Sequence, residues 1–576
     1  MKLLKYLCFI IATAVAYSCS DDTPSNTDPE NPENPTPGEP EEPDVPSDPK
    51  LLYNGIKLPD AWPPVRSYTS DIEKGMSPFY LETKPEVINI SVGRQFFVDD
   101  FLIKSTTLKR VYHYPELYAG NPVLKADKAW EMTGTKGASF AAPFSDGVWY
   151  DESEQKFKMW YMGGGGSYSV NGAGVMCYAE STDGINWTKP ELSIVKGTNI
   201  VDYNSDRDAS VVWIDKQEEN SSKRYKMFLV ERVDSKWRYT YKTSADGKTW
   251  RETANSKDIA DRSTVYKNPF RNNWVFSMRH NVRINASKLV RARDYNENED
   301  PVAGTKNAEA KLSAFWFGPW PNELHHPSYP DVDPAIYNLD ATPYESLMLG
   351  FFSVWAGPEN DVCASDNVIK RNQVMVGYSR DGYSWYREDM NPFIPVSENA
   401  AAWNAGNVQS VAGSPLIVND KLYFYVSGRR LDNGNEITTT GLATLRRDGF
   451  ASMTGSGELT TNKLQFDGKY FFVNAKITGS LKVELLDENG EVISGFSKDD
   501  CNPITGDSTK KLVTWSSNQS LDSIQGKNII VKFYLDGGDL YSFWISTDEA
   551  GISKGYTGGG GPGFNVNGQD KKINEI

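Results

Sequence analysis

Acidic residues stand at or near the start of several short apolar segments that lie far apart in the sequence. Cleavage of an acetal needs one protonated carboxyl group to assist the leaving oxygen, and a second, ionised carboxylate that acts as nucleophile or activates water. Carboxyl groups on separate segments can perform this chemistry when the fold gathers the segments around one axis. The candidates with this placement are Asp146, Asp208, Asp261 and Glu345.

The surroundings of each candidate predict its role. Glu345 lies between an aromatic residue and an apolar run, where desolvation raises the pKa of a carboxyl group, so we expect it to be the general acid. Asp208 follows Arg207 and should stay ionised, to orient the substrate or to stabilise a cationic transition state. Asp146 fits the base or nucleophile, with Asp100 as the alternative. Each carboxylate alone could equally cap a turn or form an ion pair at a strand end.

Further side chains could contact the substrate, together with Asp100, Arg207 and Asp261. Arg279 and His280 end an aromatic segment and could bind a hydroxyl group or a uronic acid carboxylate, or form a salt bridge at the rim. Trp316 and Trp320 belong to a predicted long loop. Exposed aromatic rings on a loop can form a sugar platform, although such a loop can also pack its rings beneath itself.

A phrase of the form Ser-x-Asp-Gly-x-x-Trp occurs three times, at 181–187, 244–250 and 379–385. Each copy follows a β-branched, tyrosine-rich segment, and Asp-Gly is a strong hairpin signal because glycine adopts the positive φ of the turn. Repetition of one hairpin along a β-rich chain is typical of a β-propeller. These phrases are similar to the Asp-box of sialidases, in which they are structural turns, so we expect no catalytic role for them.

The chain of 576 residues is long enough for two folded domains. Five strand–turn–aromatic-strand units predict an all-β fold with a five-bladed β-propeller over 51–452. Alternating strands after it predict a β-sandwich over 453–552, and the glycine-rich end, 553–576, should be loose.

The N-terminus has the features of an export signal. A basic start and a short apolar stretch form a predicted signal peptide, 1–18, and the sequence around Cys19 resembles a bacterial lipobox. The acidic residues that follow are similar to the surface-export signal of Bacteroidota lipoproteins. This implies lipidation of Cys19, a disordered acidic and proline-rich tether over 19–50, and a lipid-anchored protein at the outer membrane, exposed on the cell surface. An ordinary signal peptide with an incidental cysteine is the alternative.

Composition limits the partners. The formal net charge of −15 argues against nucleic acid, whose phosphates require clustered lysine and arginine. Beyond the signal peptide and Cys19, three scattered cysteines and four histidines show no metal-site spacing, so we expect neither a metal nor another cofactor. Aromatic residues make up 12% of the chain, which fits cross-strand packing first and sugar stacking second.

The order of lipobox, propeller with acidic strand starts and C-terminal sandwich resembles the five-bladed glycoside hydrolases of families 32 and 43. Arg207-Asp208 is similar to their Arg-Asp-Pro motif, with Ala209 in place of proline, and their nucleophile and acid motifs are absent. The resemblance implies a divergent glycosidase with a carbohydrate substrate and, as partners, glycan-uptake proteins of the same surface system. The alternatives are a non-catalytic glycan-binding lipoprotein and a phosphorylase-like propeller, which would need an arginine or histidine cluster.

Overall fold

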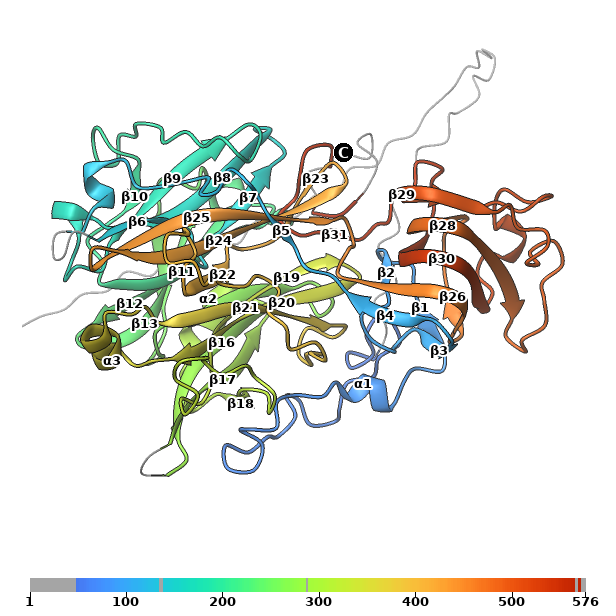
Figure 1. Ribbon diagram of the computed structural model, residues 1–576, viewed down its shortest axis with the longest axis horizontal. Helices are drawn as coiled ribbons and strands as arrows, with labels where there is room; N and C mark the ends of the chain where they lie inside the picture. The colour runs from blue at the N-terminus through green and yellow to red at the C-terminus, as the bar shows by residue number, and fades with distance from the viewer. Residues whose placement is uncertain (1–47, 134–137, 286–287, 565–567, 571–576) are drawn as a thin grey trace, which may run out of the picture. The chain divides into compact units, whose positions relative to one another are not determined.

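The computed structural model describes residues 48–133, 138–285, 288–564 and 568–570. The predicted signal peptide, Cys19 and nearly all of the predicted tether lie outside the described residues. Within the described part the helices are short, at α1 (Phe79–Glu82), α2 (Pro301–Asn307) and α3 (Asn360–Asp366), and strands dominate (Figure 1). None of these helices has the length and apolar character needed to span a membrane.

Antiparallel sheets form the first three blades of a propeller. Blade 1 consists of β6 (Ser139–Ala142), β7 (Val148–Asp151), β8 (Lys156–Gly163), β9 (Val175–Ser181) and β10 (Ile200–Asp202). Blade 2 consists of β11 (Arg207–Ile214), β12 (Tyr225–Val233), β13 (Lys236–Ser244) and β14 (Arg251–Asn255). Blade 3 consists of β15 (Thr264–Asn268), β16 (Asn273–Arg283), β17 (Leu289–Asn298) and β18 (Ala314–Phe317).

Two further blades complete the propeller. Blade 4 consists of β19 (Ala335–Glu345), β20 (Leu347–Gly357) and β21 (Arg371–Ser379). Blade 5 consists of β22 (Asn407–Val411), β23 (Leu416–Val418), β24 (Lys421–Asp432), β25 (Asn435–Arg446) and, as its outermost strand, β5 (Glu116–Leu117). Strand β5, which precedes blade 1 in the chain, thus pairs with β25 of blade 5, and β6 of blade 1 also pairs with β25. These pairings join the first blade to the last.

The innermost strands of the blades form a closed ring. Strand β11 contacts β7 and β15, and β19 contacts β15 and β22. The ring closes where Val148 of blade 1 bridges Gly413 of blade 5, its amide donating to the carbonyl of Ala412 at 3.1 Å. The predicted five-bladed propeller is therefore confirmed, and the starts of its inner strands surround one axis.

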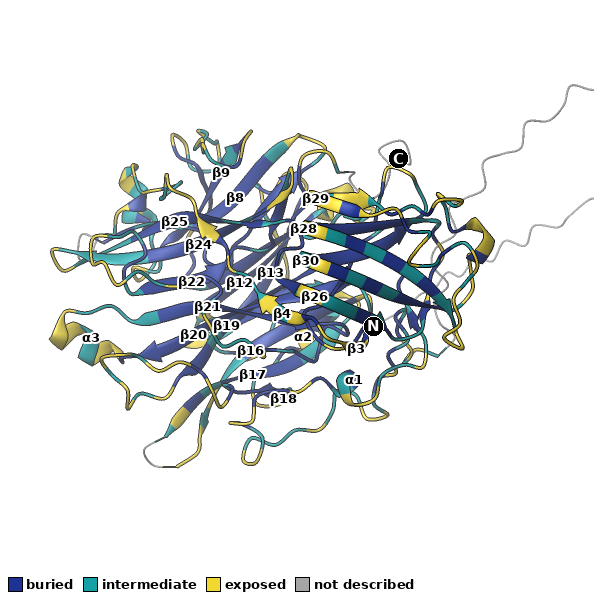
Figure 2. Cartoon of the chain, turned by 45° about the vertical axis from the view of Figure 1, so that its right-hand side comes forward, coloured by how far each residue is buried: buried dark blue, intermediate teal, exposed yellow. Residues whose placement is uncertain are grey.

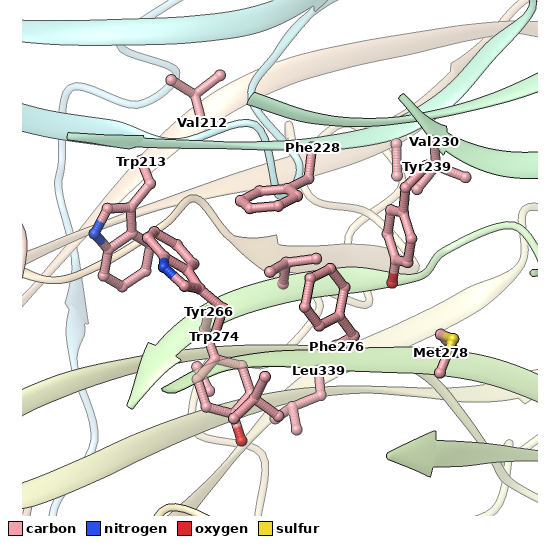
Figure 3. Packing of buried hydrophobic residues seen from close by; sticks show 14 of the residues in the cluster. Val212, Trp213, Phe228, Val230, Tyr239, Tyr266, Trp274, Phe276, Met278 and Leu339 are labelled. Atoms are coloured by element: carbon pink, nitrogen blue, oxygen red, sulfur yellow. The ribbon is translucent and has the colours of Figure 1, made fainter. Parts of the chain in front are cut away.

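Aromatic side chains fill the space between neighbouring blades. Trp213 and Phe228 of blade 2 face Trp274 and Phe276 of blade 3 (Figure 3). The ring centroids of Trp213 and Trp274 are 5.7 Å apart, and those of Phe228 and Phe276 are 5.8 Å apart. Such edge-on pairs bury large apolar areas and fix the angle between blades, so most of the aromatic content serves packing.

The three Ser-x-Asp-Gly-x-x-Trp phrases adopt one common turn. The amides of Gly184, Gly247 and Gly382 each donate to the preceding serine hydroxyl at 2.9 Å. These glycines have φ between +71° and +75°, which favours glycine over any side chain. The turns stabilise hairpins, as predicted.

A second sheet forms the sandwich and has its own apolar core. Its strands are β26 (Ala451–Thr461), β27 (Leu464–Gln465), β28 (Tyr470–Asp487), β29 (Ile504–Leu512) and β30 (Ile529–Ser546), joined by β1 (Ile88–Asn89), β2 (Gln95–Phe96), β3 (Ile103–Thr106) and β4 (Lys109–Tyr112). The long strands β28 and β30 break register near Ile477 and Gly538, which lets the sheet bend over its core. Their buried and partly exposed residues alternate (Figure 2).

Two predicted boundaries are wrong. The segment 88–112 was expected in the propeller, yet β1–β4 pair with sandwich strands, because its apolar residues complete the sandwich core. The glycine-rich end was expected to be loose. Instead, residues 553–564, here called the C-terminal strap, hold β31 (Tyr556–Thr557) against β19. The strap also accepts hydrogen bonds from the amides of Tyr150 and Ile417.

Candidate functional site

The starts of the inner strands gather charged residues at one end of the propeller axis. Three non-glycine residues there have positive φ: Phe144 at 43°, Arg262 at 55° and Ser410 at 63°. Such strained backbone costs energy and tends to concentrate at functional sites. The three come from blades 1, 3 and 5, so the strain surrounds the axis.

Asp146 and Arg207 join blades 1 and 2. One carboxylate oxygen of Asp146 accepts from Arg207 Nη2 at 2.7 Å and from the Ser210 hydroxyl at 2.5 Å. Asp146 is fully buried, and burial raises the pKa of its carboxyl group although Arg207 opposes the shift. Asp146 therefore holds Arg207 in place in this structure, and its predicted role as base or nucleophile stays a prediction.

Asp208 and Arg262 join blades 2 and 3. The Arg262 amide donates to Asp208 Oδ2 at 2.8 Å, and its guanidinium lies 3.1 Å from Oδ1. The Asp208 side chain keeps 15% of its surface exposed. Arg262 also lies over the rings of Phe144 (5.6 Å) and Tyr337 (5.5 Å), which belong to blades 1 and 4. A guanidinium of blade 3 that contacts residues of blades 1, 2 and 4 lies at the axis, and Asp208 lies beside it.

Asp261 adds a third carboxyl group at this end. It pairs with Arg279, and 30% of its side chain is exposed. Burial raises its pKa; Arg279 opposes this shift, and the negative charge of Asp208 adds to it. The structure thus brings Asp146, Arg207, Asp208, Asp261 and Arg279 to one end of the axis, and their roles stay predictions.

Asp340, which sequence reasoning missed, lies in the middle of β19. Its carboxylate accepts from Asn338 Nδ2 at 2.9 Å, and the Asn338 amide also donates to the Ser410 hydroxyl of blade 5 at 3.2 Å. Burial raises the pKa of Asp340 to about 7, against hydrogen bonds from Ser145, the Val411 amide, Asn338 and Ser410. Asp340 belongs to blade 4 and Ser145 to blade 1, so the Asp340 side chain points across the axis. The available signal was an aspartate within a strand whose other residues are mostly apolar.

The prediction for Glu345 as general acid is wrong in its position. Glu345 ends β19, five residues beyond Asp340, which is about 16 Å along an extended strand. Burial raises the pKa of its carboxyl group, as its apolar neighbours predicted, but Arg447 and Arg94 oppose the shift. Its oxygens accept from Arg447 at 3.0 Å and from the hydroxyl of Ser553 in the C-terminal strap at 2.6 Å. Glu345 therefore anchors the strap and lies outside the axial group.

Four predicted substrate contacts also lie elsewhere. Asp100 pairs with Arg110 and is 68% exposed, because its segment joins the sandwich. His280 pairs with Asp294, since consecutive strand residues point to opposite faces and its neighbour Arg279 takes the axial one. Trp316 is fully buried because its segment forms strand β18 instead of a loop, and Trp320 is 8% exposed.

The axial group offers an asymmetric pair of carboxyl groups. Asp340 can hold a proton near neutral pH, while Asp208 is bound by a guanidinium as a carboxylate acceptor. No cluster of three or more histidine, cysteine, aspartate or glutamate side chains suited to a metal ion occurs among residues that the structure describes. Cys177, Cys363 and Cys501 are free thiols.

No protein-family model matches the sequence, and no curated protein resembles it. Solved structures similar to the chain include an N-acetylgalactosamine deacetylase from F. plautii (12% identity, TM-score 0.37, covering 57% of this chain and 97% of that chain). A fructofuranosidase from Schwanniomyces occidentalis is similar at 10% identity and a TM-score of 0.31, covering 73% and 98%. A glycoside hydrolase is similar at 12% and 0.37, covering 58% and 92%. Likenesses this distant assign no activity to the chain.

Proposed function

We propose that this chain is a glycoside hydrolase that cleaves glycosidic bonds at the propeller axis. Asp340 is the general acid, and Asp208 is the ionised carboxylate that acts as base or nucleophile. The observation that carries the proposal is that Asp340, whose pKa burial raises to about 7, takes hydrogen bonds from blades 1 and 5 at the axis, where Asp208 of blade 2 is held by a guanidinium. Acetal cleavage requires this difference in protonation between two carboxyl groups.

The partition of roles follows from the partners of each acid. The hydrogen bonds that lower the pKa of Asp340 come from neutral donors, and burial outweighs them. Asp208 has a guanidinium on one oxygen and a backbone amide on the other, and its side chain remains partly exposed to an incoming substrate. Asp261 lies close enough to interact with Asp208 and contributes to the binding of sugar hydroxyl groups.

The test is hydrolysis of a panel of aryl glycosides and glycan fragments by purified protein and three variants. Asp340→Asn should lose about 10²–10⁴-fold in kcat/KM on glycosides with poor leaving groups, yet little on dinitrophenyl glycosides, which need no protonation. Asp208→Asn should lose activity on both. Asp100→Asn, an exposed aspartate in the sandwich region, is the matched control and should match the unmodified protein.

Three results would speak against the proposal. Binding of glycans without turnover by the unmodified protein would favour a non-catalytic binding protein. Cleavage that depends on inorganic phosphate would identify a phosphorylase. Equal activity of Asp340→Asn and the unmodified protein on every leaving group would remove Asp340 from the reaction.

We further propose that Cys19 carries a lipid that anchors the chain to the outer membrane, where it would act on carbohydrate beside glycan-uptake proteins. The lipobox-like sequence and the acidic residues after Cys19 support this placement. Metabolic labelling with a palmitate analogue should mark the unmodified chain and not Cys19→Ala. Protease treatment of intact cells should remove the chain if it is surface-exposed.

A further inference from the structure

A cavity of about 300 Å³ lies beside Trp320, away from the axial acids. Its walls come from the N-terminal segment, strand β17 and the segment that follows β18. The lining includes apolar residues at Val290, Pro319, Trp320, Pro321 and Pro334, and polar residues at Glu73, Lys288, Glu323, His325 and Asp333. Ligand sites of proteins begin at about this volume, which suits one small ring.

The apolar wall is rigid. Trp320 packs edge-on against Phe352, with ring centroids 5.5 Å apart, and the guanidinium of Arg387 lies 4.4 Å from its ring centroid. Gly75 lies so close to Trp320 that a Cβ there would lie 2.6 Å from the indole. Glu323 in turn binds Arg387 at 2.6 Å and is not available to a ligand. The indole therefore keeps one orientation with or without a ligand.

Polar side chains also line the cavity. Trp320 lines the cavity and keeps 8% of its surface exposed. His325 Nδ1 lies 2.9 Å from the carbonyl oxygen of Pro330 and must donate to it, which leaves Nε2 of the neutral ring as an acceptor. Lys288 bridges Glu73 and Asp333, whose side chains are 52% and 53% exposed.

The position of the cavity relates it to the axial site. Asp333 and Pro334 immediately precede β19, which carries Asp340. Val290 belongs to β17, whose next residue, Arg291, is close enough to Asp261 to lower its pKa. The cavity therefore borders blades 3 and 4 at the same strand ends that carry the axial residues.

A hollow that combines proline and tryptophan walls with polar side chains matches the two characters of a sugar ring, whose C–H faces are apolar and whose edge carries hydroxyl groups. We propose that this Trp320 pocket binds one neutral sugar unit of the glycan that the axial site cleaves. The assignment to the same glycan rests on the proposed function, whereas the binding of a sugar does not.

The experiment uses the full chain labelled with 5-fluorotryptophan and observed by fluorine NMR. Trp320→Phe removes one of the 16 tryptophan signals and so identifies the Trp320 resonance. Methyl glycosides of common neutral hexoses, pentoses and deoxyhexoses are titrated one at a time. At least one should shift the Trp320 signal in a saturable manner, because a sugar bound in the cavity changes the surroundings of the indole that lines it.

Two variants locate the sugar. Glu73→Gln and Asp333→Asn should each weaken the titration about fivefold, as expected for the loss of one charged hydrogen-bond acceptor. Asp331→Asn, an exposed aspartate two residues away that does not line the cavity, should leave it unchanged. A Trp320 signal that no glycoside moves, or one that moves equally in both pocket variants and the unmodified chain, would overturn the proposal. Since this readout needs no turnover, it stays informative even if the chain proves inactive on every glycoside.

Discussion

Replacement of Asp340 by asparagine should make the stability of this protein less dependent on pH while removing the proposed general acid. The folded protein holds the Asp340 proton up to a pKa of about 7, whereas the unfolded chain releases it near the ordinary 3.8. Between these values the folded state binds more protons, so the free energy of unfolding falls as pH rises. The loss is complete above about pH 7 and absent below about pH 4.

The size of the effect follows from the same values. A pKa of about 7 in place of 3.8 corresponds to roughly 4 kcal/mol of destabilisation at pH 8 relative to pH 4. Asparagine keeps the acceptor for Asn338 and offers an N–H₂ group to the neighbouring hydroxyls, but it has no charge to desolvate. The stability of Asp340→Asn relative to the unmodified protein should therefore rise by up to about 4 kcal/mol over this range.

The assay is guanidinium unfolding followed by tryptophan fluorescence at several pH values, with Asp100→Asn as the exposed control. Taking the difference between variant and unmodified protein cancels the other buried carboxyl groups, Asp146 and Asp261 included. The same proton should appear in kcat/KM, which should decline as pH rises through about 7. Parallel stability curves for Asp340→Asn and the unmodified protein would refute the reasoning.

Three further predictions concern residues away from the axis. Glu345→Gln leaves two arginines facing a neutral partner and should cost about 3–5 kcal/mol of stability in denaturant unfolding. The folded variant should keep its kcat on aryl glycosides. Loss of kcat would restore Glu345 as a catalytic candidate. Gly561→Ala places a Cβ 1.9 Å from the Ile417 carbonyl oxygen and should cost about 1–3 kcal/mol of stability in thermal unfolding. Gly559→Ala, where the nearest atoms lie at 3.3 Å, should cost less. Equal costs would contradict close packing of the strap. The pKa of Asp183 is about 2, because amide hydrogen bonds from Asn186 and Ile185 outweigh its burial. The stability that Asp183→Ala removes should therefore be present above about pH 4 and vanish toward pH 2. A difference in stability between variant and unmodified protein that does not depend on pH would exclude the turn hydrogen bonds as its source.

The blades could be predicted from the sequence because their signals are local. An Asp-Gly turn followed by tryptophan depends on residues that are neighbours in the chain, and the structure forms it in the same way at Gly184 and Gly247. The allocation of 88–112 to the sandwich could not be predicted, since it depends on which of two cores those apolar residues complete. The packing of the strap could not be predicted for a related reason. A glycine-rich sequence indicates a loose chain, but glycine also permits close contact because it has no side chain, and Gly561 lies against the Ile417 carbonyl.

Strand β19 shows why the sequence pointed to Glu345 as the acid, whereas the structure favours Asp340 of the same strand for the proposed role. Asp340 and Glu345 are both buried, and burial raises the pKa of each. At the strand end, two arginines from distant parts of the chain neutralise Glu345 and turn it into an anchor. At the axis, Asp340 receives only amide and hydroxyl hydrogen bonds, which stabilise a negative charge less than a guanidinium does. Local sequence predicts burial, but the partners that decide whether a buried carboxyl group keeps its proton arrive from other blades, and only the closed ring determines which residue becomes the acid.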